Sequence, residues 1–105
     1  MRIWDLVHCT DDVLLVVTEL VANVIQHTDG DGDLLLTVRA DVILIEVADS
    51  NPRPPTLVDL DVRRLDGRGL LLVASVARRW GSRPESWRGH PGKVVWAEIA
   101  VHTAP

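Results

Sequence analysis

A polar stripe interrupts an otherwise apolar segment in the first third of the chain. Asn23 follows Glu19 by four residues, and Gln26 or His27 comes three or four residues later. The segment around them is rich in valine and leucine. This spacing places them on one side of a predicted helix that should be mostly buried, where an unpartnered carboxylate or carboxamide is costly. A Glu and an Asn one turn apart can form a Mg²⁺ pocket with a proton acceptor beside it. The structural alternative is a solvent-facing stripe, which is the commoner origin of such a pattern on an arbitrary helix.

Two other features could contact a ligand. Asp49 ends the apolar segment 42–48 and precedes a proline-rich segment, so its carboxylate could accept hydrogen bonds from a ligand amine. The alternative is an Asx turn that opens the loop. Gly67 and Gly69 precede a second helical pattern, where glycines let the backbone approach phosphates and the helix N-terminus favours anions. This glycine pair is neither a dinucleotide-binding fingerprint nor a Walker loop.

The elements that would position these residues follow from periodicity and turn signals. We predict a first helix that starts at Thr10 and ends before the turn cluster 29–32, a hairpin, a loop over 50–66, a second helix and two further strands. The strands are predicted at 34–39, 42–48, 80–83 and 93–101, and the second helix at 70–79. Strand 42–48 is apolar enough to be buried on both faces. The order predicts an α/β (α+β) two-layer sandwich, with a mixed, mostly antiparallel sheet and helices packed on one face.

Composition limits the class of protein. The 105 residues form a single domain (1–105), and a net charge of −4 gives no basic surface for direct nucleic-acid or anionic-membrane binding. Cys9 is the only cysteine, which excludes an internal disulfide and a metal–thiolate cluster. Residues 1–9 are too polar for a signal peptide, and the longest apolar stretch is too short to span a bilayer. We therefore expect a cytoplasmic protein.

Five motifs, taken in order, resemble the GHKL (Bergerat-fold) ATPase and kinase superfamily. Segment 18–27 (TELVANVIQH) looks like its N box, 47–52 (VADSNP) like its first glycine box and 67–73 (GRGLLLV) like its second. Segments 77–81 (ARRWG) and 92–96 (GKVVW) resemble the closing segments of the small anti-sigma factor serine/threonine kinases. Order and spacing agree over about residues 4–101, nearly the whole chain.

The resemblance implies a role for each matched residue. Glu19 would be the general base, Asn23 would hold Mg²⁺, and Asp49 would accept a hydrogen bond from the adenine amino group. The residues expected near the phosphates of ATP or ADP are His27, Gly67, Arg68 and Gly69. Surface positions without a ligand contact remain the alternative for His27 and Arg68.

The resemblance also implies a function. It points to an ATP-binding anti-sigma regulatory protein, a Mg²⁺-dependent kinase that binds a sigma factor and phosphorylates an anti-anti-sigma protein. The alternative is a non-catalytic nucleotide-binding or docking module in the same kind of partner-switching system. A sensor histidine kinase catalytic domain ranks last, because the sequence lacks a dimerisation helix with a phospho-accepting histidine.

Three departures from the family pattern carry expectations of their own. Asn51 and Arg53 stand at glycine positions of the first glycine box, and Val94 stands where a hydroxyl residue often supports the adenine site. The family's usual first strand and most of its first helix are missing, so the chain looks truncated at its N-terminus. A sheet edge and an apolar helix face should then be open, and we expect a homodimer with Trp4, Leu6 and Val7 near the contact. The alternative is that residues 1–9 fold back over the gap.

Overall fold

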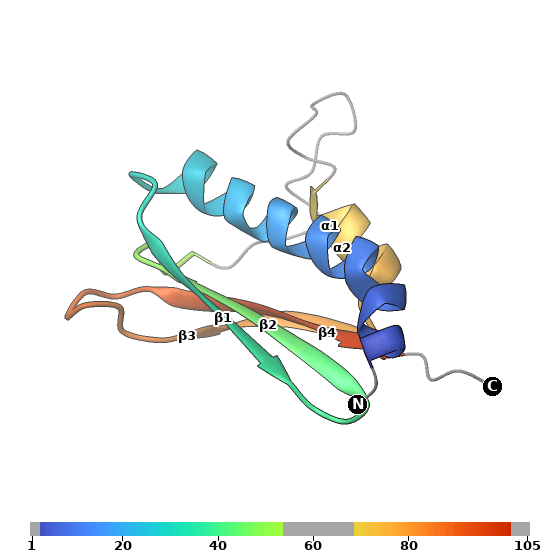
Figure 1. Ribbon diagram of the computed structural model, residues 1–105. Coiled ribbons are helices and arrows are strands. Elements are labelled where there is room, and N and C mark those ends of the chain that lie inside the picture. The colour runs from blue at the N-terminus through green and yellow to red at the C-terminus, as the bar shows by residue number, and fades with distance from the viewer. Residues whose placement is uncertain (1–2, 54–68, 102–105) are drawn as a thin grey trace.

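A computed structural model describes residues 3–53 and 69–101, which form two helices packed on one face of a four-stranded sheet (Figure 1). The order of elements is α1 (Ile3–His27), β1 (Gly32–Val38), β2 (Val42–Asp49), α2 (Gly69–Val76), β3 (Arg79–Pro84) and β4 (Lys93–Ala100). The sheet order is β1-β2-β4-β3. The predicted two-layer fold is confirmed, but every strand pairing in the described part is antiparallel, so the expected mixed sheet is not seen there.

Helix α1 is longer than the sequence predicted. It begins at Ile3, so the expected start at Thr10 is wrong, and residues 3–9 extend the helix instead of folding back. The capping signal at Thr10 is local, whereas Cys9 continues the apolar face and is buried. The predicted end is confirmed. The Thr28 amide and hydroxyl both donate to the Val24 carbonyl, and Gly30 turns the chain with a φ of 92°.

The core lies between the helices and the sheet. Along β2, buried residues alternate with half-buried ones, so the expectation that this strand is buried on both faces is wrong. In an antiparallel sheet with helices on one side only, successive side chains point alternately to the core and away from it. The core residues are Cys9, Val16, Leu20 and Val24 of α1, Ile43, Ile45 and Val47 of β2, Val73 of α2, and Val95, Ala97 and Ile99 of β4, with Val101 after it.

The bounds of the elements in the second half of the chain differ slightly from those predicted. Helix α2 ends at Val76 instead of residue 79, because Arg78 already donates its amide to the Glu98 carbonyl and Arg79 begins β3. The predicted strands near 80–83 and 93–101 are confirmed. Most of the predicted loop 50–66 lies outside the described residues.

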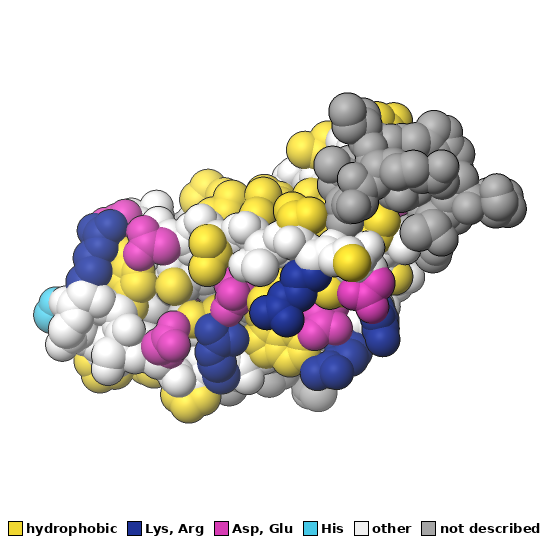
Figure 2. All heavy atoms as spheres, turned by 60° about the horizontal axis from the view of Figure 1, so that its bottom comes forward, with side chains coloured by type: hydrophobic (Ala, Val, Ile, Leu, Met, Phe, Trp, Pro, Cys, Tyr) yellow, Lys and Arg dark blue, Asp and Glu magenta, His cyan; other side chains and the backbone are white. Residues whose placement is uncertain are grey.

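Charged side chains lie among hydrophobic ones in the view of Figure 2, and the sheet face that carries no helix holds two cross-strand contacts of arginine. Arg83 bonds Glu46 across the sheet at 2.6 Å, and the Arg79 guanidinium lies 5.8 Å from the ring centre of Trp96. The β3–β4 connection reaches the start of β1, where the Trp87 indole N–H donates to Asp33 at 2.9 Å. These contacts connect the β3–β4 hairpin to β1 and β2. No helix among the described residues is long and apolar enough to cross a membrane.

Candidate nucleotide-binding site

A buried ion pair lies where β2 ends and β4 begins. Asp49 and Lys93 are direct cross-strand partners, and both side chains point to the sheet face covered by the helices. The Lys93 ammonium lies 2.9 Å from Asp49 Oδ1 and 3.0 Å from Oδ2. Asp49 is 2% exposed and Lys93 5% exposed, so each charge compensates the other away from bulk water.

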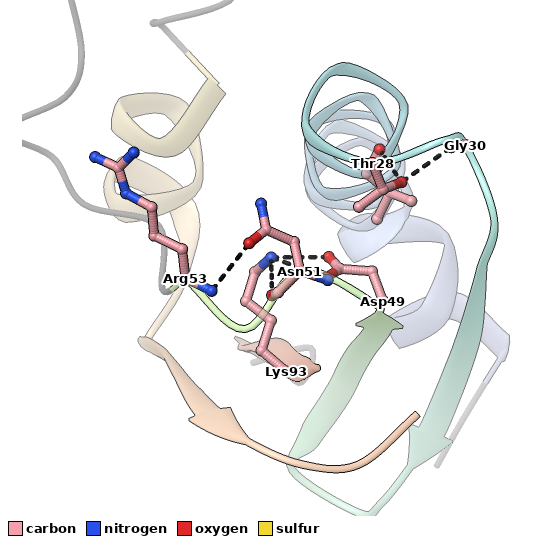
Figure 3. Close-up of polar contacts among 7 residues, drawn as sticks. Thr28, Gly30, Asp49, Asn51, Arg53 and Lys93 are labelled. Carbon is pink, nitrogen blue, oxygen red and sulfur yellow. Dashed lines mark hydrogen bonds and ion pairs between the residues drawn. The ribbon is translucent and has the colours of Figure 1, made fainter. Parts of the chain in front are cut away.

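Two consecutive side-chain turns shape the backbone beyond Asp49. The Asn51 amide donates to Asp49 Oδ1 at 2.8 Å, and the Arg53 amide donates to Asn51 Oδ1 at 3.0 Å. The Asn51 carbonyl accepts a third hydrogen bond from Lys93. Figure 3 shows Asp49, Asn51 and Lys93 converging, while the guanidinium of Arg53 points away from them. The Asx turn considered from the sequence is therefore present, and it does not exclude a ligand contact.

The Asp49 carboxylate retains the capacity to accept one more hydrogen bond. Oδ1 accepts from both Lys93 and the Asn51 amide, whereas Oδ2 accepts only from Lys93 among the described residues. Each carboxylate oxygen has two lone pairs, so Oδ2 can accept one further hydrogen bond. A bond made there, away from water, is stronger than one made at the surface. A hydrogen-bond donor is the chemical group that this oxygen could pair with.

Gly92 makes the close approach of β4 possible. A Cβ atom at this position would lie 2.2 Å from the Asp49 carbonyl oxygen, which no side chain tolerates. The glycine immediately before Lys93 therefore lets β4 begin directly beside the end of β2. In contrast, neither Asn51 nor Arg53 has a positive φ, so the backbone needs no glycine at these two positions of the first glycine box.

The polar stripe predicted on α1 lies on the flank facing away from β1. Successive helical residues are about 100° apart, so relative to the buried face of Leu20, Glu19 and Asn23 lie on one side and Val21 and Ile25 on the other. The second side borders β1, because Val21 and Ile25 line a groove with Leu34. Helix α2 also contacts α1 and β3, at the far side of the sheet from β1. Glu19 and Asn23 are thus on the α2 side, both half-buried.

Glu19 and Asn23 make no side-chain hydrogen bond to the residues that the structure describes, which are 3–53 and 69–101. A half-buried carboxylate and carboxamide without protein partners, one turn apart, suit a polar ligand that lies between the helices. Asp49 lies at the end of β2 on the side of the sheet that these helices cover.

The sequence profile of the histidine kinase-like ATPase domain matches residues 7–99. The chain belongs to this family. The match covers nearly all of the described fold, and it agrees with the antiparallel sheet and its two helices. Membership indicates that this histidine kinase-like ATPase domain binds ATP. A search among curated proteins gave no match.

Some expected site residues of this ATPase domain cannot be placed. Gly67 and Arg68 lie outside the described residues, and so does the side chain of His27, the last residue of α1. Gly69 is the first residue of α2, as expected for a glycine that opens a helix beside phosphates. The roles of these four residues remain predictions.

Lys93 is the residue of the candidate site that sequence reasoning missed. Val94, which the resemblance placed where a hydroxyl residue often supports the adenine site, pairs with Ala48 and points to the helix-free face. Lys93, one residue earlier, is on the face of Asp49. The sequence did hold a signal, since Lys93 is the only lysine and directly follows a glycine. Interpreting this signal required the register between β2 and β4, because Asp49 and Lys93 are 44 residues apart in the sequence.

Proposed function

We propose that this chain is an ATP-dependent anti-sigma regulatory kinase that transfers phosphate to a serine or threonine of an anti-anti-sigma protein. Its other partner would be a sigma factor. Family membership supports the nucleotide, and the motif pattern of the small anti-sigma kinases supports the partners. The observation that carries the proposal is the buried Asp49 carboxylate, which Lys93 and the Asn51 amide hold with one acceptor position open.

Asp49 would select the base. Its open lone pair on Oδ2 accepts a hydrogen bond from the adenine 6-amino group. Guanine carries a carbonyl oxygen at the same ring position. This oxygen and the Asp49 carboxylate are both acceptors, so no hydrogen bond could form between them. Adenine nucleotides should therefore bind in preference to guanine nucleotides.

Asn23 would hold the metal ion of the nucleotide. In the described part of the chain no three His, Cys, Asp or Glu side chains gather to form a metal site. One carboxamide fits Mg²⁺, which usually keeps several waters and binds proteins through one or two oxygens plus substrate phosphates. When bound, the ion would neutralise charge that develops on the transferring phosphoryl group.

Glu19 would act on the acceptor protein. Its carboxylate takes the proton from the incoming hydroxyl, the hydroxyl oxygen bonds the γ-phosphorus, and the bond from that phosphorus to the bridging oxygen breaks to release ADP. Glu19 and Asn23 are one helical turn apart on the same flank of α1, so the base and the metal ligand would lie on the same side of the nucleotide.

A second candidate function is a docking module that binds nucleotide weakly or not at all. The observation that favours it is the first glycine box, where Asn51 and Arg53 replace glycines and Asn51 is held in the side-chain turns. Backbone that carries side chains approaches a ligand less closely than glycine does. The two candidates differ in nucleotide affinity and in phosphoryl transfer.

Removing the Asp49 carboxylate is expected to weaken ATP binding. Because Asp49→Asn alone would leave the Lys93 charge buried and unpaired, the test uses Asp49→Asn combined with Lys93→Met. In this double variant no buried charge remains. Asparagine has an NH2 group in place of one carboxylate oxygen, so the acceptor for the adenine amino group is lost. Calorimetric titration should show ATP binding weakened about tenfold, as expected for one charge-assisted hydrogen bond.

The control for this experiment is Lys93→Met combined with Asp49→Leu, which removes both charges and the whole polar group. It should bind ATP no better than the asparagine variant. Unchanged ATP affinity in both folded variants would show that the base does not contact Asp49, and the adenine assignment would then be wrong.

Asn23→Ala is expected to remove the dependence of nucleotide binding on Mg²⁺. The wild-type chain should bind ATP more tightly with Mg²⁺ than with a chelator, whereas the variant should show the same weak affinity in both. Gln26→Ala is the matched control, because Gln26 lies on the same helix and is exposed. A variant that keeps the full Mg²⁺ effect would exclude Asn23 as the metal ligand.

A further inference from the structure

The connection between β3 and β4 reaches across the end of β2 to β1. In the sheet β2 separates β4 from β1, and its last residue, Asp49, pairs with Gly32 on one side and with Lys93 on the other. Trp87 lies in the connection, and its indole N–H donates to Asp33 Oδ2 of β1 at 2.9 Å. The two strands that flank the end of β2 are therefore joined by a side chain as well as through β2 itself.

Trp87 is held in a tight turn. Its amide donates to the His90 carbonyl at 2.8 Å, and the His90 amide donates back to the Trp87 carbonyl at 3.0 Å. Between them Arg88 and Gly89 have φ values of 49° and 81°, the positive values that a two-residue type I′ turn requires. The Arg88 guanidinium lies 4.4 Å from the ring centre of Trp87 and 3.0 Å from Asp31 Oδ2. The turn and the overlying guanidinium therefore restrict where the indole ring can lie.

Gly92 links Trp87 to the buried ion pair. A Cβ atom on Gly92 would lie 3.1 Å from the Cβ atom of Trp87, and it would overlap the carbonyl oxygen of Asp49. The glycine is thus enclosed between the tryptophan and the end of β2, and the next residue is Lys93. The Lys93 ammonium has three donors, and it directs two to the Asp49 carboxylate and one to the Asn51 carbonyl. A displacement of the connection would therefore move Gly92 and Lys93 and change how the carboxylate is held.

We propose that Trp87 is a positioning residue for nucleotide binding. Its bond to Asp33 ties the start of β4 to β1, which keeps Lys93 on the carboxylate and the open acceptor position of that carboxylate directed to the base. Trp87 acts without touching the nucleotide, because Asp33 is on the helix-free face of the sheet and Asp49 is on the opposite face. The inference rests on the proposed contact between Asp49 and the adenine amino group.

The replacement Trp87→Phe tests the role of the indole N–H. It keeps an aromatic ring beside Gly92 but removes the group that donates to Asp33. Calorimetry is expected to show ATP binding weakened about threefold to tenfold, the range for one net hydrogen bond. The preference for ATP over GTP should fall by the same factor, because guanine does not use the acceptor on Asp49. Trp96→Phe is the matched control on β4 and should bind ATP as the wild type does.

Variants of the acceptor test whether the bond itself matters. Asp33→Asn keeps an oxygen for the indole N–H and should bind ATP nearly as tightly as the wild type, whereas Asp33→Ala should weaken binding as much as Trp87→Phe. Combining Trp87→Phe with Asp33→Ala should weaken binding no further, because both changes remove the same bond. Arg88→Met removes only exposed ion pairs with Asp31 and Asp33, and it should have little effect.

Hydrogen exchange of the indole N–H gives a reciprocal test. If the bond favours ATP binding, ATP must favour the bond, so exchange of the Trp87 indole N–H with solvent should slow when ATP binds. Its signal in NMR spectra is the one that Trp87→Phe removes. The Trp96 indole N–H is the reference and should be unaffected. The side chain of Trp4, expected like that of Leu6 near a homodimer contact, lies outside the described residues.

The outcomes separate this inference from the proposed function. A wild-type chain that binds ATP, together with a Trp87→Phe variant that binds it equally well and an exchange rate that ATP leaves unchanged, would overturn the positioning role alone. A variant that loses stability but keeps full affinity would do the same, since the bond would then serve the fold only. If Trp87→Phe does not fold, Asp33→Ala tests the same bond. A folded wild-type chain that binds no ATP would overturn both proposals.

Discussion

Lys93→Met is expected to lower the free energy of unfolding by about 3–5 kcal/mol, the usual result of breaking a buried ion pair by removing one partner. The physical reason is the Asp49 carboxylate, which stays 2% exposed but loses the ammonium that compensates its charge. The Asn51 carbonyl loses a donor as well. Urea denaturation, monitored with a probe of tertiary structure, measures the change in the free energy of unfolding.

A control variant distinguishes the effect of the buried Asp49–Lys93 pair from that of an exposed ion pair. Arg83→Met removes the ion pair with Glu46, in which the arginine is exposed, and should cost no more than about 1 kcal/mol. Replacing both buried partners, with Lys93→Met and Asp49→Leu, should recover most of the lost stability because no charge remains buried. A loss in Lys93→Met as small as in Arg83→Met would show that Asp49 and Lys93 are not a buried pair in solution.

Glu19→Ala is expected to reduce phosphoryl transfer by about a hundredfold to ten-thousandfold while ATP affinity stays nearly unchanged. A general base acts on the acceptor hydroxyl in the chemical step, so its removal affects the rate of transfer and not nucleotide binding. The measurement is transfer of the γ-phosphate from ATP to a co-expressed anti-anti-sigma protein, paired with calorimetry for ATP.

Two further variants make this result specific. Glu19→Gln keeps the shape of the side chain but cannot take a proton, and it should be as inactive as Glu19→Ala. Glu85→Ala removes an exposed carboxylate outside the site and should transfer phosphate normally. Equal losses of ATP affinity and transfer rate in Glu19→Ala would place the residue in nucleotide binding and contradict its role as a base.

Local patterns predicted most of the secondary structure. The alternation and turn signals between residues 29 and 49 gave a hairpin whose strands differ from the observed ones by one or two residues. The start of α1 was missed because Thr10 followed by two carboxylates satisfies every local rule for a helix start. The choice depends on the burial of Cys9 against the sheet, which is a tertiary contact and leaves no local signal.

The candidate site was predicted in part. The motif order identified Glu19, Asn23 and Asp49 from residue types alone, and the structure places the first two on the flank of α1 that faces α2. The partner of Asp49 could not be predicted, because strand periodicity says which residues share a face but not which residue of a distant strand lies opposite. The residue beside Asp49 is Lys93 and not Val94, because a shift of one residue in a strand moves a side chain to the other face.

Calorimetric titration of the wild-type chain with ATP, with and without Mg²⁺, tests nucleotide binding most directly. GTP under the same conditions is the matched ligand, because it differs at the group that Asp49 would contact. The structure predicts that ATP binds with one site per chain, more tightly with Mg²⁺, and that GTP binds more weakly. A folded sample that binds neither nucleotide at millimolar concentration, or binds GTP as well as ATP, would contradict the assignment of Asp49 as the adenine acceptor.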